Sequence, residues 1–409
     1  MKILVSAYAC EPNKGSEPSV GWEWAVELSK LGHEVWVITR ANNKVNIDKE
    51  LLSRKNLESL HFVYYDLPEK ICSWKKRSGL VRLYYLLWQW WAYRHIIAKH
   101  EEIGFDFVHH VTFVSVRQPS FMGNLGIPFI FGPVGGGEKA PLNLRQGYGV
   151  RGVILDAIRD LLNKLVKVDP LMWMTFRQAN GIFVTSPQTK SLIPRRYWQK
   201  TKILLGIGLD SSFSETLPAL IKQEPNVGGA RILYVGRLIY WKGMHLGLSA
   251  FASTIKSIPH ARLTIVGSGP DEKRWRRLAK NLGVDNNITW VPWVRQSELK
   301  EVYAKHDFFL YPSLHDSGGM VLLESMAYGL PVVCLNVGGP GVIVDESCGL
   351  AVNIENEQKR VIEDLSNAIK VLSNDRVLYA RLSKGAIARS KAYIWKNMSA
   401  ERAKVLFAK

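Results

Sequence analysis

Two carboxylates beside a pair of glycines form the segment of this sequence with the clearest chemistry. Asp316 and Glu324 have seven residues between them, and Gly318 and Gly319 lie in that interval. The apolar stretch at 308–311 predicts a strand before them, and a helix is predicted to begin directly after the glycines. Glycines expose backbone N–H groups at a helix start, where phosphates bind, and carboxylates accept hydrogen bonds from sugar hydroxyls. The segment therefore predicts a ligand with a central diphosphate and polyols at both ends, which is the shape of a nucleotide sugar.

The alternative interpretation of this segment is purely structural. In it Asp316 caps the helix and Glu324 is a surface residue.

A second loop carries cations after a predicted strand at 232–235. Gly236 allows a sharp turn there, Arg237 offers a planar fork of donors that suits phosphate oxygens, and Lys242 adds a charge just before a predicted helix. Two cations and a helix start predict a pyrophosphate site. The alternative is a solvated basic loop.

The first half of the chain offers weaker candidates. Glu17 either contacts an acceptor or occupies the first turn of a helix, where acids are favoured. His109 and His110 lie on opposite faces of a predicted strand, and we favour His110 as the one that faces a ligand. A packed, hydrogen-bonded histidine is the alternative for either. Gly135 and Gly136 lie at the tip of another predicted strand, which indicates either close approach of a ligand or a flexible loop.

The elements that must position these residues alternate between short apolar strands and helices. Such alternation predicts βαβ units with parallel sheets, and therefore two doubly wound α/β domains. We expect an N-terminal Rossmann-like acceptor-side domain over 1–208, with a helix at about 393–409 packing back on it. A nucleotide-sugar donor domain is expected over 209–392. A linker between the domains is expected at 211–230. Ligands of such sheets bind beyond the carboxyl ends of the strands, and we expect the site in a cleft between the domains. The predicted strands are 3–8, 35–39, 62–65, 107–111, 129–132, 182–185, 232–235, 263–266, 288–291, 308–311 and 332–335.

Composition narrows the class of protein. The 409 residues are 47% hydrophobic and 22% charged, which excludes a disordered tail, a collagen-like fibre and a disulfide miniprotein. With 54 basic and 36 acidic side chains the net charge is +18, which implies an anionic partner. No nucleic-acid-binding motif is present, so we expect no nucleic acid. His and acidic residues do not gather at ligand spacing, so we expect no metal and no cofactor.

Basic and aromatic segments suggest what the anionic partner is. The basic run at 74–77 leads into an aromatic stretch at 80–93, in which only two residues are polar. A helix of that length spans about 21 Å, too short to cross a bilayer core of about 30 Å. We expect a cytoplasmic protein, peripheral on the inner face of the cell membrane, with an anionic membrane surface as partner. The alternative is that the stretch is a core helix. A second amphipathic stretch carries Arg145, Arg151, Arg159, Lys164 and Lys167.

The second half of the chain resembles the family 4 glycosyltransferases, retaining enzymes with the two-domain GT-B fold. The resemblance extends over about 110 residues and rests on four segments with the family's order and spacing. It implies that Arg237 and Lys242 bind the donor diphosphate, that Glu324 holds the nucleotide ribose and that Asp316 holds sugar hydroxyls near the reacting carbon. Asp316 departs from the pattern, because the family has Glu there. The segments are Gly236-Arg237-Leu238 with Lys242-Gly243, Gly267-Ser268-Gly269-Pro270, Tyr311-Pro312-Ser313 and the run from Asp316 to Val333.

The resemblance implies a function and a set of site residues. The implied reaction is transfer of a sugar from a nucleotide-diphosphate sugar to an acceptor hydroxyl on a lipid-linked glycan or oligosaccharide of the cell envelope. The alternatives are a nucleotide-sugar epimerase of the same architecture and a non-catalytic basic protein that binds membranes or nucleic acid. The implied catalytic residues are Asp316, His110, Arg237 and Lys242. The implied donor-binding residues are Gly15, Gly236, Arg237, Lys242, Val294, Asp316, Gly318, Gly319, Met320, Val321 and Glu324. The implied acceptor-side residues are Glu17, Gly135, Gly136 and Glu138.

Overall fold

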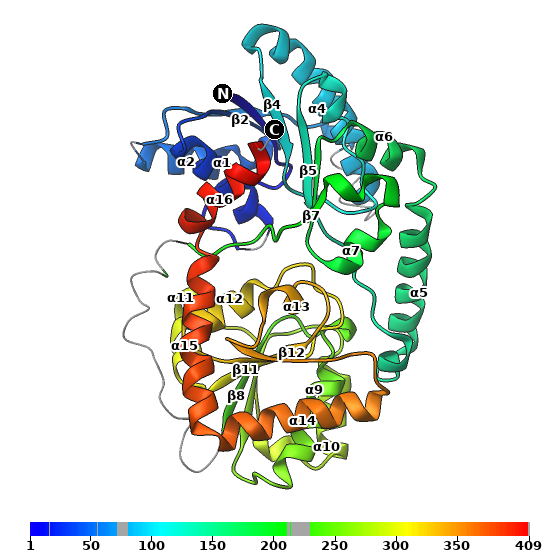
Figure 1. The fold of residues 1–409 in the computed structure, drawn as a ribbon, viewed down its shortest axis with the longest axis vertical. Helices are drawn as coiled ribbons and strands as arrows, with labels where there is room; N and C mark the ends of the chain where they lie inside the picture. The colour runs from blue at the N-terminus through cyan, green and yellow to red at the C-terminus, as the bar shows by residue number, and fades with distance from the viewer. Residues whose placement is uncertain (16, 55, 72–80, 211–212, 214–229, 408–409) are drawn as a thin grey trace. The chain divides into compact units, whose positions relative to one another are not determined.

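The structure, a computed structural model, divides into two α/β units (Figure 1). It describes residues 1–15, 17–54, 56–71, 81–210, 213 and 230–407. Unit 1 comprises residues 1–137, 161–207 and 395–409, and unit 2 comprises residues 138–160 and 208–394. The basic run at 74–77, and all of the expected linker except residues 213 and 230, lie outside the described residues.

One segment groups differently from our expectation. Residues 138–160, which we placed in the first domain, belong to unit 2. The reason is that buried polar side chains of this segment, including Glu138 and Asp156, find their hydrogen-bond partners in unit 2.

Unit 1 is built on a parallel sheet of seven strands in the order β3-β2-β1-β4-β5-β6-β7. Every residue of β4 and β5 is buried, as expected for strands that are covered on both faces. The strands are β1 (Lys2–Ser6), β2 (Glu34–Thr39), β3 (Leu60–Tyr64), β4 (Phe107–His110), β5 (Phe129–Val134), β6 (Gly181–Val184) and β7 (Thr201–Ile203).

Unit 2 contains a parallel sheet of six strands in the order β10-β9-β8-β11-β12-β13. All of the strands predicted from the sequence are confirmed in the two units, within two residues at either end. The short edge strands β7 and β13 were not predicted. The strands of unit 2 are β8 (Arg231–Val235), β9 (Arg262–Val266), β10 (Ile288–Val291), β11 (Phe308–Tyr311), β12 (Val332–Leu335) and β13 (Gly349–Val352).

Both sheets contain a point where the strand order reverses. The reversal lies between β1 and β4 in unit 1 and between β8 and β11 in unit 2. Crevices outside the carboxyl ends of the strands at such switch points are where doubly wound sheets bind ligands. The residues that follow β8 and β11 are therefore the first place to look for a site in unit 2.

The helices connect successive strands, as the alternating pattern predicts. Several begin at sequence signals: Asp169 caps α6 by accepting from the backbone N–H of Leu171 at 2.8 Å, and Asp375 caps α15 in the same way. The helices of unit 1 are α1 (Glu17–Lys30), α2 (Lys44–Ser53), α4 (Val81–Ile103), α6 (Pro170–Gln178), α7 (Pro187–Leu192) and α16 (Trp395–Phe407). Those of unit 2 are α9 (Met244–Ile255), α10 (Glu272–Asn281), α11 (Gln296–Ala304), α12 (Met320–Ala327), α13 (Pro340–Ile343), α14 (Gln358–Asn374) and α15 (Arg376–Ala392). Helix α5 (Val150–Leu165) has its residues to Asp160 in unit 2 and the rest in unit 1.

The aromatic helix α4 is a core helix along one of its faces. Tyr84, Tyr85 and Trp88 are buried in the core of unit 1, whereas Trp90 and Trp91 are 43% and 50% exposed. One face of the helix is thus core, and the other presents indoles to solvent. Among the residues that the structure describes, no helix has the length and apolar character needed to cross a bilayer.

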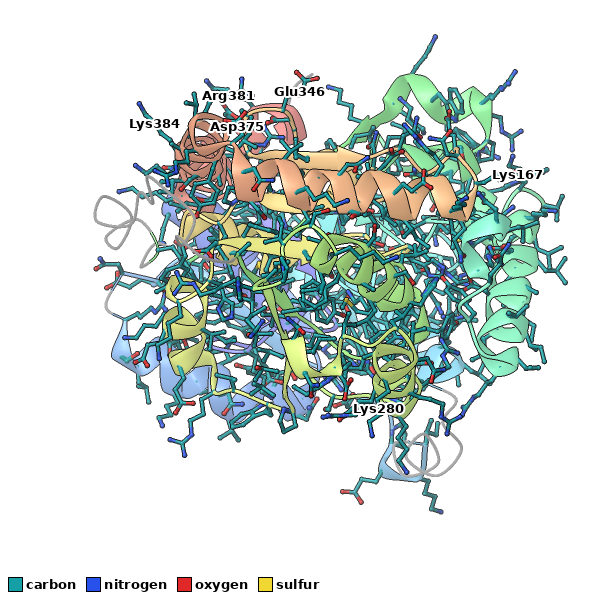
Figure 2. The ribbon with its side chains drawn as sticks, turned by 90° about the horizontal axis from the view of Figure 1, so that it is seen from below. Lys167, Lys280, Glu346, Asp375, Arg381 and Lys384 are labelled. Atoms are coloured by element: carbon teal, nitrogen blue, oxygen red, sulfur yellow. The ribbon has the colours of Figure 1, made fainter. Side chains whose placement is uncertain are left out.

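Excess positive charge lies on the surface of both units. Figure 2 labels four exposed cations, Lys167, Lys280, Arg381 and Lys384, among the side chains. The first belongs to unit 1 and the other three to unit 2.

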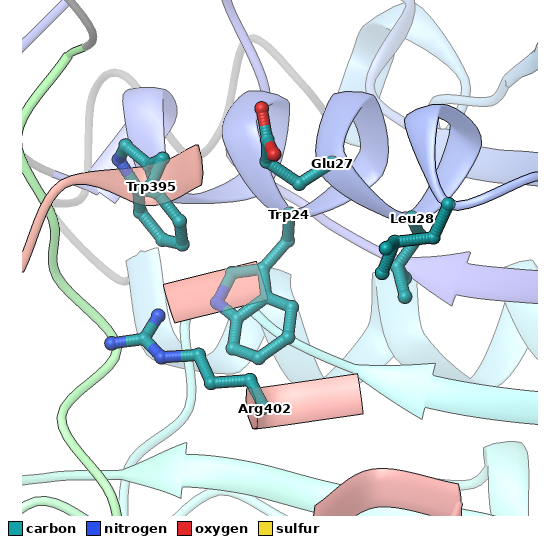
Figure 3. A pocket seen from close by; sticks show the side chains of 6 residues that line it. Trp24, Glu27, Leu28, Trp395 and Arg402 are labelled. Atoms are coloured by element: carbon teal, nitrogen blue, oxygen red, sulfur yellow. The ribbon is translucent and has the colours of Figure 1, made fainter. Parts of the chain in front are cut away.

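The last helix, α16, packs on α1 within unit 1 (Figures 1 and 3). The Trp395 ring meets the Trp24 ring at 6.0 Å with an edge-on geometry. The Arg402 guanidinium lies 5.2 Å from the centre of the Trp24 ring and donates to the carbonyl of Ile207 at 3.1 Å. Ring and cation–π contacts therefore attach α16 to α1, and the hydrogen bond attaches it to the segment after β7.

Gly243 permits a close approach between the loops that follow β8 and β11. It has φ +68°, and a Cβ there would lie 1.9 Å from the carbonyl oxygen of Pro312. The loop after β8 can therefore lie directly against the loop after β11, and the backbone N–H of Leu314 donates to the carbonyl of Trp241 at 2.8 Å.

We predict that Gly243→Ala destabilises the protein by more than about 2 kcal/mol, since it adds a backbone clash to a left-handed conformation that costs about 1 kcal/mol by itself. Gly283 is a matched control, because it has φ +70° and a Cβ added there would have nothing within 4 Å. Gly283→Ala should cost only about 1 kcal/mol. Urea denaturation measures both, and equal losses would contradict the close approach.

Candidate functional site

The tips of β8 and β11 are joined by an ion pair in unit 2. The Lys242 ammonium lies 2.5 Å from Asp316 Oδ2 and donates to Tyr311 Oη at 2.5 Å. Tyr311 Oη also donates to Asp316 Oδ2. The side chains of Lys242 and Asp316 are 15% and 20% exposed, so the pair is largely enclosed but open to a ligand on one side.

Electrostatics fix the protonation of this cluster. Burial, and then the negative charge of Asp316, raise the pKa of Tyr311 well above its usual value. The phenol therefore keeps its proton and serves as a donor, and Asp316 receives hydrogen bonds from a phenol and an ammonium. A phosphate oxygen that enters the cluster would find a cation already held in place.

The start of α12 lies directly beyond this ion pair. Gly319 is the N-cap residue, with φ +129° and no side-chain capping hydrogen bond. The interpretation of Asp316 as the helix cap is therefore wrong. Gly318 lies against Gly339: a Cβ added at Gly339 would lie 2.2 Å from the carbonyl oxygen of Gly318. Met320 and Val321, the first residues of the helix, are half-buried.

Glu324 lies one turn inside α12 and is not a solvated surface residue. Its Oε2 accepts a hydrogen bond of 2.9 Å from the phenol of Tyr303. Burial raises the pKa of Glu324, and the hydrogen bond from Tyr303 partly opposes that rise. The buried phenol thus orients the carboxylate.

The other residues that we predicted to bind the donor lie at the same edge of the sheet and make fewer contacts. Arg237, directly after Gly236, is exposed at the tip of β8, and no carboxylate among the described residues pairs with it. Val294 is half-buried beyond β10, the edge strand, which lies three positions from β11 in the sheet order. The structure brings Lys242 and Asp316 into contact and leaves Arg237 free to reorient.

Glu138 lies against the donor-side loop of unit 2. It is 1% exposed, and its Oε2 accepts a hydrogen bond of 2.7 Å from Ser317 Oγ. Ser317 directly follows Asp316, so Glu138, which we expected on the acceptor side, supports the loop after β11.

The residue before Asp316 is held from the same segment. Arg159 donates to His315 Nδ1, and because arginine cannot accept, His315 carries its proton on Nε2. That N–H donates to Asp156 Oδ2 at 3.1 Å, and Arg145 lies 3.4 Å from the same oxygen. Both neighbours of Asp316 in the chain are therefore fixed by buried carboxylates of residues 138–160.

This network changes the interpretation of the second amphipathic stretch. Arg145 is 5% exposed and pairs with Asp160 at 2.6 Å as well as with Asp156. Arg159 lies 3.9 Å from Glu138. These two cations are internal ion-pair partners and are not membrane-facing charges.

In unit 1, Glu17 lies at the strand-order reversal and has a structural partner. It begins α1, and its Oε1 accepts from the backbone N–H of Phe113. Phe113 has φ +60°, an uncommon conformation for a bulky residue. Glu17 thus stabilises the loop after β4. Gly15, in the loop before α1, is exposed, and a Cβ added there would have nothing within 4 Å.

The histidines of β4 are both core residues. His110 is 1% exposed; its Nδ1 lies 2.7 Å from Ser120 Oγ and its Nε2 lies 2.8 Å from Tyr85 Oη. His109 is also buried, with Nε2 at 2.8 Å from the carbonyl of Gly132. The geometry gives no support for a catalytic His110, because both of its ring nitrogens already have protein partners.

The glycines after β5 approach other parts of the chain. Gly135 bridges to Ser115, and its N–H donates to the carbonyl of Val114 at 3.2 Å. Gly136 has φ +90°, and its carbonyl accepts from Asn163 at 3.1 Å. Packing within unit 1 is sufficient to explain these glycines.

Sequence reasoning missed the two tyrosines that orient the carboxylates and the residues that support the loop. Tyr311 ends β11, and its position next to the loop was a usable signal. Tyr303 and Asp156 offered none, because their roles depend on contacts between distant parts of the chain. Three or more His, Cys, Asp or Glu side chains arranged to hold a metal are not found among the described residues.

Comparison with known proteins is consistent with this geometry. Residues 219–389 match the family model described as glycosyl transferases group 1. An uncharacterized glycosyltransferase of Haemophilus influenzae is 30% identical over 165 residues, which are 40% of this chain and 44% of that protein. The chain spans less than half the length of the curated relatives that it matches.

Solved structures share the whole fold. Sucrose-phosphate synthase from Thermosynechococcus elongatus has a TM-score of 0.59 at 19% identity and covers 100% of this chain and 99% of its own. HepE of Anabaena, solved in complex with UDP, has a TM-score of 0.61 at 15% identity and covers 100% of both chains. The fold is thus GT-B, with two Rossmann-like domains, and residues 219–389 are similar to the group-1 glycosyl transferases.

We predict that Glu138 and Ser317 are energetically coupled. Glu138→Ala should cost about 3 kcal/mol, because it removes one partner from a buried charged network. Ser317→Ala should cost about 1 kcal/mol, and the double variant should cost less than the sum. The exposed Glu346, labelled in Figure 2, is the control, and Glu346→Ala should change stability by less than about 0.5 kcal/mol. Urea denaturation tests the cycle, and strict additivity would count against the contact.

We predict that acid destabilises unit 1 through its buried histidines. Burial lowers the pKa of His110 to about 3 and that of His109 to about 4. The unfolded chain binds these protons near pH 6.5, so the stability that the neutral rings contribute is present above pH 6.5 and is lost as pH falls toward about 3. Each ring contributes a slope of up to about 1.4 kcal/mol per pH unit. The dependence of stability on pH should be shallower in His110→Gln; equal slopes would contradict this assignment.

Proposed function

We propose that this protein is a retaining glycosyltransferase that moves a sugar from a nucleotide-diphosphate sugar to an acceptor hydroxyl. The observation that carries the proposal is the Lys242–Asp316 ion pair at the strand-order reversal of unit 2, beside the start of α12. A cation and a carboxylate at that point suit a ligand with one anionic part and one part rich in hydroxyls.

The proposed catalysis is mainly electrostatic. Negative charge develops on the diphosphate as it leaves, and Lys242, Arg237 and the N–H groups at the start of α12 would stabilise it. These groups would do the work that a metal ion does in other transferases, so we propose that the reaction needs no metal.

The two carboxylates would orient the donor. Asp316 would accept from sugar hydroxyls while the acceptor oxygen bonds to the sugar carbon on the face where the bond to the diphosphate breaks, and the acceptor's hydroxyl proton would pass to an oxygen of the departing diphosphate. Glu324, whose Oε2 is held by Tyr303, would accept from ribose hydroxyls through its other oxygen.

The proposed acceptor is a lipid-linked glycan of the cell envelope, which would place the protein on the cytoplasmic face of a membrane. The net charge of +18 and the exposed indoles of α4 support a contact with an anionic bilayer. The UDP in the HepE complex makes uridine nucleotides the first donors to test.

The test is a thermal-shift series with UDP, GDP, ADP and their sugars. A ligand at a hundred times its Kd should stabilise by about 2.7 kcal/mol, which is a shift of a few degrees in a chain of this size. Arg237→Ala should lose that shift and keep its own Tm, because Arg237 has no ion-pair partner among the described residues. Lys242→Ala should lose the shift and also lower the Tm, because it breaks the ion pair.

Arg381→Ala, an exposed arginine on α15, is the control and should keep the full shift. No shift with any nucleotide would overturn the proposal. A donor that turns over without any added acceptor would favour the epimerase.

A further inference from the structure

Unit 1 carries a hollow that none of the donor or acceptor residues uses. It has a volume of about 400 Å³. It is lined by two cations, a hydroxyl, an indole and two apolar side chains. These residues are Lys167, Arg195, Ser191, Trp198, Ile193 and Pro194.

The hollow lies in a strongly basic part of unit 1. Residues 161–207 contain one acidic side chain, Asp169, which is engaged as the cap of α6. Within the described part of the chain, no carboxylate forms an ion pair with the cations at the hollow. The basic side chains of this segment are Lys164, Lys167, Arg177, Lys190, Arg195, Arg196, Lys200 and Lys202.

Two tryptophans hold several of these cations at the surface. Arg196 lies 4.6 Å from the centre of the Trp173 ring, and Arg195 and Lys190 each lie 5.9 Å from that of Trp198. Trp173 also donates to the carbonyl of Lys167 at 2.8 Å. We call these six residues, Lys167, Trp173, Lys190, Arg195, Arg196 and Trp198, the basic–aromatic surface.

Exposed apolar side chains adjoin the basic–aromatic surface. Trp173 and Trp198 are 40% and 38% exposed. Val168, in the connection between α5 and α6, is 66% exposed, and Leu171, in the first turn of α6, is 38% exposed. A site for a soluble anion needs the cations alone. Cations together with indoles and aliphatic side chains are typical of a surface that lies at the headgroup level of a bilayer.

We propose that the basic–aromatic surface docks unit 1 on an anionic phospholipid bilayer, with a headgroup phosphate in the hollow between Lys167 and Arg195. The guanidinium of Arg195 and the ammonium of Lys167 supply donors for the phosphate oxygens. The indoles and Val168 contact the boundary between headgroups and acyl chains. This inference rests on the membrane association in the proposed function and assigns it to particular residues.

The experiment is co-sedimentation of the full chain with vesicles of phosphatidylcholine, with and without phosphatidylglycerol. Wild type should bind only the anionic vesicles. Each basic residue near such a surface contributes about fivefold to partitioning, so Lys167→Ala/Arg195→Ala should bind roughly 30-fold more weakly.

The control removes the same charge from unit 2. Arg381 and Lys384 are exposed on α15 and labelled with Lys167 in Figure 2. Arg381→Ala/Lys384→Ala lowers the net charge equally and should bind like wild type. An equal loss in both double variants would mean that overall charge attracts the protein to the vesicles, and would overturn the assignment to this surface.

Two further measurements distinguish failure of the docking proposal from failure of the proposed transferase function. Free inorganic phosphate at the lipid-phosphate concentration should not displace the protein; displacement would reassign the hollow to a soluble anion and overturn the proposal. Nucleotide thermal shifts should be unchanged in Lys167→Ala/Arg195→Ala. If vesicle binding fails while those shifts persist, the docking surface is wrong and the transferase proposal stands.

Discussion

The ion pair between Lys242 and Asp316 links two strands that are neighbours in the sheet of unit 2 but lie far apart in the chain. Its formation requires that β8 and β11 be parallel neighbours in the sheet, so that both loops emerge at one edge. It also requires Gly243, which lets the first loop lie against the carbonyl of Pro312. The geometry of the candidate donor site follows from these constraints, because the glycines, the helix start and Glu324 are placed by the same two loops.

The loop that carries Asp316 depends on a segment from the other half of the chain. Glu138 and Asp156 hold Ser317 and His315, which are 179 and 159 positions away in the sequence. Burying carboxylates is costly unless each one is paired and hydrogen-bonded, and here arginine, serine and histidine supply the partners. The gain is a fixed conformation for the two neighbours of Asp316, and therefore a defined position for its carboxylate.

Several residues of unit 1 are of types that are common in active sites and also have packing partners inside the unit. A histidine at a strand end, a glycine run and an acid at a helix start are each common in active sites, yet His110, Gly135 and Glu17 all find partners inside the unit. The strands were predictable because a buried parallel strand is a short continuous apolar run. The edge strands β7 and β13 were not predicted, because three or four residues give too weak an apolar pattern.

The sequence by itself determined the two parallel α/β units and the set of residues at the strand tips of unit 2. The units and these residues can be predicted from local sequence patterns, namely apolar runs, glycines after strands, and cations and carboxylates at fixed spacing. Only the tertiary structure decided how these residues are used. It paired Lys242 with Asp316, placed Arg145 and Arg159 in internal ion pairs, and placed Glu138 against the loop after β11. Such contacts depend on which segments, distant in the sequence, pack against one another in the fold, and a local sequence pattern does not determine this packing.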